Sequence, residues 1–132
     1  MKREILFKGK CIYSNDWLYG DYVLVTHNYA IKVRGKEPYF PVHQFSISQF
    51  TGLKDKSANK IFEGDRIRYT EHPGYLLKSF EGWIIYDTEY AAFGVMGVPG
   101  RLTPMFFTEI DCLDTDFLMH CQVLGNIHDY TE

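Results

Sequence analysis

The segment that decides the fold covers residues 49–69 and reads QFTGLKDKSANKIFEGDRIRY. Its middle is polar and rich in turn-forming residues, and Glu-Gly-Asp follows at 63–65. A glycine between two acidic residues predicts a tight turn at Gly64-Asp65, with Gly64 at positive φ or too crowded for a Cβ atom. In the next four residues, Arg-Ile-Arg-Tyr, charged and apolar side chains alternate, which predicts a half-buried strand.

A similar pattern stands earlier in the chain. Residues 22–25, Tyr-Val-Leu-Val, combine β-branched and aromatic side chains and predict a strand. The preceding Gly20-Asp21 predicts a structural turn before this strand, of the same kind as Gly64-Asp65. No stretch in this half has the apolar spacing of a helix over a convincing length.

The second half repeats these signals. Residues 82–87 and 90–95 are rich in aromatic and β-branched side chains and are joined by a short Asp/Thr/Glu turn, which predicts a β-hairpin. Residues 117–124 predict a closing strand, and Gly125 predicts a bend or bulge at its end.

These segments together predict a mainly β fold. Strands about ten residues apart with Gly and Pro between them are typical of antiparallel architectures. We expect short antiparallel strands that form a small, partly open β-barrel with an additional N-terminal β unit. The 132 residues suit one domain. A weak internal boundary is predicted in the polar, lysine-rich residues 51–60, between the N-terminal unit and the barrel.

Three phrases of the chain resemble the YopX family of small bacteriophage and prophage proteins. They are the opening residues 3–10, the segment 49–69 and the closing residues 123–128, in the family's order. The resemblance spans nearly the whole chain and implies a single YopX-like domain over residues 1–132. It implies an uncharacterised phage or prophage protein, because the family is known without an assigned activity.

Aromatic residues are unusually frequent, with ten Tyr, ten Phe and two Trp making 17% of the chain. Aromatic side chains favour strands and are enriched at interfaces. A domain of this size buries only about two-thirds of its chain's surface, so we expect exposed aromatic surface that holds a homo-oligomer together. The basic residues 1–10 and the acidic residues 101–132 can pair head to tail between copies, or within one chain.

The three cysteines are odd in number and form no Cys-x-x-Cys pair, which suits a reducing compartment. No apolar run is long enough for a signal peptide or a membrane span. We therefore expect the protein to stay in the cytoplasm of the bacterial host cell, away from membranes.

No pattern of catalytic or metal-binding residues emerges. Cys121 follows His120 directly, so on a strand their side chains would point to opposite faces. The five histidines are scattered singly, and no phosphate-binding glycine loop is present. The sequence therefore predicts no enzyme activity, no metal and no cofactor.

One group of basic residues supports an alternative. Small β-barrels bind single-stranded nucleic acid by combining cations that follow the backbone with rings that stack on bases. The net charge of −3 argues against nucleic acid as the main partner. The candidate residues are Lys54, Lys56, Lys60, Arg66 and Arg68, with Phe62 and Tyr69 between them.

Two hypotheses follow. The first is a non-enzymatic β-rich phage protein that self-assembles and binds a host or phage protein as an accessory factor. The alternative is a small-barrel protein that binds single-stranded nucleic acid in phage replication or regulation.

Overall fold

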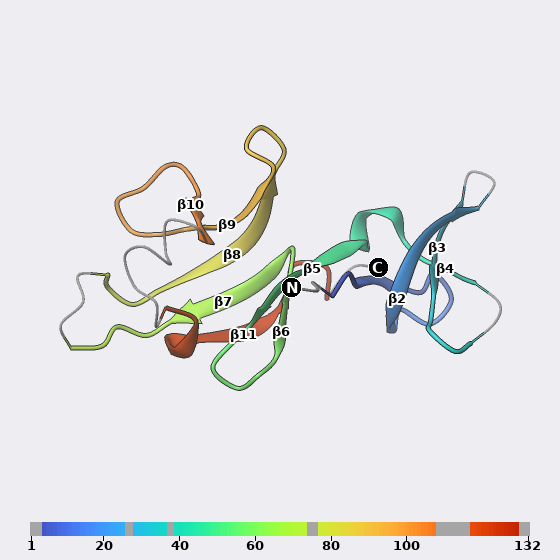
Figure 1. Ribbon diagram of the computed structural model, residues 1–132, viewed down its shortest axis with the longest axis horizontal. Coiled ribbons are helices and arrows are strands. Elements are labelled where there is room, and N and C mark those ends of the chain that lie inside the picture. Colours follow the sequence, from blue (N-terminus) through green and yellow to red (C-terminus); the bar gives the residue numbers. More distant parts are fainter. Residues whose placement is uncertain (1–3, 26–27, 37–38, 74–76, 108–116, 130–132) are drawn as a thin grey trace. The chain divides into compact units, whose positions relative to one another are not determined.

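The computed structural model describes residues 4–25, 28–36, 39–73, 77–107 and 117–129 (Figure 1). The chain divides into two compact units. Unit 1 contains residues 1–52 and 128–132, and unit 2 contains residues 53–127. Within the segment 51–60, residues 51–54 belong to a strand and Lys60 begins the next, so the connecting loop is residues 55–59.

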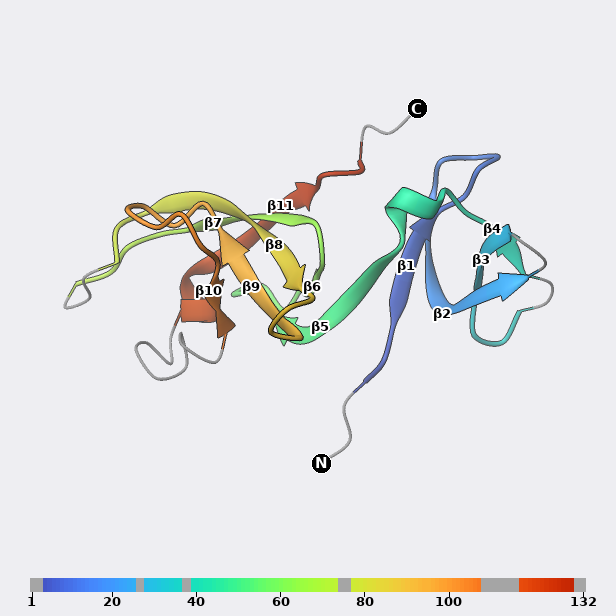
Figure 2. The ribbon, with the colours of Figure 1, turned by 90° about the horizontal axis from the view of Figure 1, so that it is seen from above.

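The first sheet has six strands in the order β4-β3-β2-β1-β5-β6. The strands are β1 (Phe7–Lys10), β2 (Trp17–Val25), β3 (Asn28–Lys32), β4 (Phe40–Pro41), β5 (Ser48–Lys54) and β6 (Lys60–Phe62). A 3-10 turn, η1 (Gln44–Ser46), precedes β5. β1 lies between β2 and β5 and is antiparallel to both (Figure 2). An antiparallel bridge between Cys11 and Val42 partly closes the strands of unit 1.

The second sheet has five antiparallel strands in the order β10-β9-β8-β7-β11. The strands are β7 (Asp65–Tyr69), β8 (Phe80–Asp87), β9 (Ala92–Met96), β10 (Met105–Phe106) and β11 (Cys121–Asn126). A 3-10 turn, η2 (Phe117–His120), leads into β11. The expectation of a mainly β fold with short antiparallel strands and a partly open architecture is confirmed.

The core of unit 2 lies on one face of this sheet. Along β7, Ile67 and Tyr69 are buried while Arg66 and Arg68, which alternate with them, are exposed, as the alternating sequence predicts. Ile84 of β8 and Val95 of β9 continue this face, and both are buried. The ring of Tyr69 stacks on that of Phe117 at a centroid distance of 4.9 Å.

The structure confirms the predicted hairpin but only part of the predicted closing strand. The predicted hairpin is confirmed by β8 and β9, and its turn is held by Asp87, whose Oδ1 accepts the N–H groups of residues 89 and 90. The prediction of a closing strand that begins at residue 117 is wrong for its first four residues, because these residues form η2. This turn buries Phe117 against the core, and pairing with β7 begins only at Cys121. The register of β11 shifts between Val123 and Gly125.

The prediction of a structural turn at Gly20-Asp21 is wrong. Both residues lie inside β2, where Gly20 pairs with Phe7 of β1 and Asp21 pairs with Lys32 of β3. A Cβ atom at Gly20 would overlap the carbonyl oxygen of Lys32. The glycine therefore permits a close approach between neighbouring backbones, which sequence alone does not distinguish from a turn.

The turn between β6 and β7 contains Gly64 at φ +83°. Its N–H donates to the carbonyl of Ile84, and its own carbonyl accepts the N–H of Ile127. Asp65 is buried, and its carboxylate accepts the backbone N–H of Phe62 and the side-chain amide of Asn126. The turn thus joins three strands through a buried carboxylate.

Replacing Gly64 with valine should lower the free energy of unfolding by about 1–3 kcal/mol, because a β-branched residue is strained at positive φ. The new Cβ would also lie 3.2 Å from the Asn126 amide nitrogen. Gly100→Val is the matched control, since Gly100 has φ +80° with no atom within 4 Å. Urea unfolding should show the larger loss for Gly64→Val, and equal losses would mean that the packing around Gly64 is irrelevant.

Candidate functional site

The basic residues singled out in the sequence lie on β5, β6, β7 and the loop after β5. Lys54, Lys56, Arg66 and Arg68 are exposed, while Lys60 is half-buried. Arg66 and Arg68 share the outer face of β7, where they pair with Trp83 and Glu81 of β8.

The two rings expected to stack on bases are not available. Phe62 is 3% exposed and Tyr69 is fully buried in the core of unit 2. The interpretation of these two rings as a stacking platform is therefore wrong, because strand alternation turns them inward. Nucleic-acid binding by the five cations stays a prediction.

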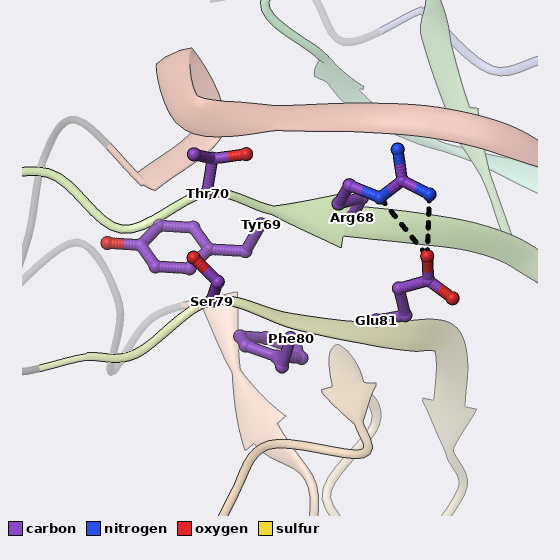
Figure 3. Close-up of a pocket in the computed structure, with 6 residues that line it drawn as sticks. All are labelled: Arg68, Tyr69, Thr70, Ser79, Phe80 and Glu81. Atoms are coloured by element: carbon purple, nitrogen blue, oxygen red, sulfur yellow. Dashed lines mark hydrogen bonds and ion pairs between the residues drawn. The ribbon is translucent and has the colours of Figure 1, made fainter.

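A shallow hollow of about 310 Å³ lies where β7 and β8 separate (Figure 3). Its polar rim is an ion pair, in which Arg68 donates two hydrogen bonds to Glu81 Oε1 at 3.1 and 2.7 Å. The remaining lining residues are Tyr69, Thr70, Ser79 and Phe80. The carboxylate that lines the hollow thus already binds Arg68, and both partners are more than half exposed, so the pair contributes little to stability.

An apolar patch lies on the sheet of unit 1, and we call it the aromatic patch. Phe7 and Tyr22 lie on the same face of β1 and β2, with ring centroids 5.8 Å apart. Tyr22 stacks on Tyr29 of β3 at 6.3 Å, and Leu24 pairs with Tyr29. Tyr22 is 39% exposed and Leu24 is 61% exposed. None of these four side chains carries a charge.

A second cluster in unit 1, the lysine–tryptophan cluster, contains Lys8, Lys10 and Trp17. Lys10 Nζ donates to the carbonyl oxygens of His128 at 3.0 Å and Asp129 at 2.7 Å. Trp17 Nε1 donates to Asp129 Oδ1 at 2.9 Å. The basic beginning and the acidic end of the sequence therefore meet within one chain, which is one of the two pairings that the charge distribution allows.

The lysines also act on His128. Burial lowers the pKa of His128, and the positive charges of Lys10 and Lys8 lower it further, although the Asp129 carboxylate opposes them. The imidazole is therefore held more strongly in its neutral form than in the unfolded chain. Stability from this group is present above its ordinary pKa of 6.5 and is lost as the pH falls below that value and through the lower folded-state pKa.

A model of the YopX protein family matches residues 7–132. The chain belongs to the YopX family. A solved structure, protein EF1440 from Enterococcus faecalis, resembles this YopX protein with a TM-score of 0.57 at 21% identity. The alignment covers 97% of this chain and 96% of EF1440. At this identity the likeness shows the fold alone. No curated protein matches.

Other candidate ligands in this YopX protein are cysteines and histidines. Cys11 and Cys121 are buried and form no disulfide, whereas Cys112 lies outside the described residues. His120 stacks on His72 with ring centroids 3.8 Å apart. Among the described residues no group of three or more His, Cys, Asp or Glu could hold a metal ion. In the same part of the chain, no helix is long and apolar enough to cross a membrane.

Sequence reasoning missed both clusters of unit 1. Phe7, Tyr22 and Tyr29 come from three strands, so their ring contacts depend on sheet register and not on sequence spacing. Lys10 and Asp129 are 119 residues apart. The opposite charges of the two chain ends were the one signal of this contact, and they did not identify the residues.

Proposed function

We propose that this YopX-family protein is a non-enzymatic accessory factor of a bacteriophage or prophage that associates with itself and with a host or phage protein. Cys11 and Cys121 form no disulfide, which supports a reducing compartment, such as the bacterial cytoplasm, as its place of action. The membership of the YopX family supports the role in a bacteriophage or prophage.

The observation that carries this proposal is the aromatic patch. Aromatic side chains bury a large area at low entropic cost and dominate interface energetics. Here two rings from neighbouring strands stack at the surface beside an exposed leucine. An apolar surface of this kind on a water-exposed sheet favours a contact site over a solvated face.

A second copy of the chain is the occupant that the patch favours. A two-fold symmetric contact brings the same patch together from both copies, so a patch with a single sign of charge would repel itself. The aromatic patch carries no charge and meets this requirement. The exposed face of β7, by contrast, carries Arg66 and Arg68, which would face like charges across such an axis.

Light scattering after size exclusion tests the proposal with Leu24→Glu. We expect the unmodified protein to exceed the monomer mass of 15.5 kDa at about 100 μM, because mass action favours association at high concentration. Leu24→Glu should return it to the monomer, since Leu24 is exposed and its replacement leaves the core intact. Leu102→Glu is the matched control, because Leu102 is 97% exposed and lies in unit 2. A monomeric unmodified protein, or an oligomer that survives Leu24→Glu, would refute self-association through this patch.

A further inference from the structure

Two neighbouring lysines of β1 are buried, which is unusual for a charged side chain. Lys8 is 7% exposed and Lys10 is 4% exposed. The two point to the same face of the strand, because they are two residues apart. Lysine is almost never fully buried unless it is paired, since removing an ammonium group from water is costly.

These lysines and the neighbouring Trp17 present hydrogen-bond donors to the end of the chain. Lys10 Nζ contacts two successive backbone carbonyls, those of His128 and Asp129. The indole N–H of Trp17 contacts the Asp129 carboxylate, and Lys8 Nζ lies 4.4 Å from the centroid of the Trp17 ring. The segment bound here is thus recognised by its backbone carbonyls and by one carboxylate.

This arrangement selects one class of ligand. Ammonium and indole groups donate hydrogen bonds and accept none, so the bound atoms must be acceptors. The positive charges of Lys8 and Lys10 favour an anionic side chain beside those carbonyls. A peptide segment that contains an aspartate or glutamate offers both the backbone carbonyls that Lys10 binds and a carboxylate for Trp17.

We propose that Lys8, Lys10 and Trp17 form a binding site for an acidic peptide segment of another protein, which the chain's own His128–Asp129 segment occupies as a tethered competitor. This site is separate from the aromatic patch, and the inference does not depend on self-association. A partner peptide must displace the tethered segment, which lowers its apparent affinity for the unmodified protein.

The hydrogen bonds of the segment support displacement. His128 and Asp129 belong to a turn and not to a strand. Their bonds to Lys10 and Trp17 come from side chains, so releasing the segment leaves the paired backbone of β1 and β2 unchanged. A purely structural contact at this position would be served as well by apolar residues, without desolvating two ammonium groups.

Fluorescence anisotropy with the full-length protein tests the inference. The probe is a labelled synthetic peptide, Asn-Ile-His-Asp-Tyr-Thr-Glu, which copies residues 126–132. The receptor is full-length Asp129→Ala, which weakens the tethered competitor and leaves the site intact. We expect this variant to bind the probe at least about tenfold more tightly than the unmodified protein does, because an intramolecular competitor acts at high effective concentration.

Two matched controls locate the contact. A probe with asparagine in place of its aspartate should bind at least about tenfold more weakly, because the charge-assisted hydrogen bond is lost. In the Asp129→Ala protein, Lys10→Met should abolish binding. Circular dichroism checks that this double variant folds. If it does not fold, Trp17→Phe in the same background removes only the indole donor and should also weaken binding.

Three results would overturn the inference. The first is equal affinity of the unmodified and Asp129→Ala proteins for the probe, and the second is equal affinity for the aspartate and asparagine probes. The third is a dimer of the unmodified protein that the free probe dissociates in light scattering. That dimer would assign the site to the same segment of a second copy and not to another protein.

Discussion

Replacing Asp55 with alanine is expected to lower the free energy of unfolding by about 2–4 kcal/mol, because one buried carboxylate that accepts four N–H groups is removed. Asp55 is 5% exposed. Its Oδ1 accepts the backbone N–H groups of Ser57 and Asn59, both at 2.9 Å. Its Oδ2 accepts the N–H of Val123 at 2.9 Å and the Asn59 side-chain amide at 3.2 Å. Urea unfolding followed by tryptophan fluorescence measures the loss.

The size of this effect follows from where Asp55 lies. β11 is an edge strand of the second sheet. The bond to Val123, together with the bond from the Lys56 N–H to the Cys121 carbonyl, covers backbone groups of that strand. Without the carboxylate, the Val123 N–H loses its acceptor, and the loop 55–59 keeps only the Lys56–Cys121 backbone bond of these two contacts with β11. Unpaired strand edges also promote aggregation, so the variant should aggregate more readily on heating.

Asp87→Ala is the matched control. Asp87 also accepts two backbone N–H groups through one carboxylate oxygen, but it does so in an exposed turn. Water can replace these bonds, so we expect a loss of about 1 kcal/mol or less. Similar losses for the two variants would show that the burial of Asp55 has no energetic importance.

The same carboxylate should make stability depend on acid. Burial raises the pKa of Asp55, but the hydrogen bonds from Val123, Asn59 and Ser57 outweigh it, and the pKa lies below its ordinary 3.8. The stabilisation is therefore present above about pH 4 and is lost as the pH falls through the folded-state pKa. Asp55→Ala should lose less stability on acidification than the unmodified protein.

The second large effect is expected for Gly20→Ala, which should lower the free energy of unfolding by about 3 kcal/mol or more. The added methyl group would overlap the Lys32 carbonyl oxygen and would lie 3.0 Å from the Val33 Cα. Both are backbone atoms, so no side chain can rotate away to relieve the overlap. β2 must then separate from β3, and the sheet of unit 1 loses pairing at its centre.

Gly35→Ala separates this overlap from the general effect of losing a glycine. Gly35 has φ +80° and has no atom within 4 Å of an added Cβ. Its replacement should lower stability by about 1 kcal/mol, the strain of a left-handed conformation alone. Urea unfolding of both variants gives the comparison. If Gly20→Ala proves no more harmful than Gly35→Ala, β2 and β3 do not approach as closely as the structure shows.

The candidate surfaces show how far local patterns reach. Alternation along residues 66–69 correctly placed Ile67 inside and the arginines outside, because side-chain direction in a strand alternates with a period of two. The same rule turns Tyr69 inward, so its interpretation as a stacking ring contradicted the strand prediction. Gly20-Asp21 resembles Gly64-Asp65 in sequence, yet the first pair lies inside a strand, whereas Gly64 lies in a turn and Asp65 begins the next strand. A glycine fits both a tight turn and a close approach of two strands, and only the position of the neighbouring strand shows which of the two is present.

By itself, the sequence determined the mainly β class, the hairpin of β8 and β9 and the outward face of β7. Each of these depends on residues that are close along the chain, where side-chain alternation and turn chemistry act directly. The tertiary structure alone decided the burial of Lys8 and Lys10, the stacking of Tyr22 on Tyr29 and the capture of Asp129 by Trp17. These contacts join segments from different strands or from opposite ends of the chain, and strand register and chain path bring them together. The composition of the chain and the spacing of its residues carry no information about strand register or chain path.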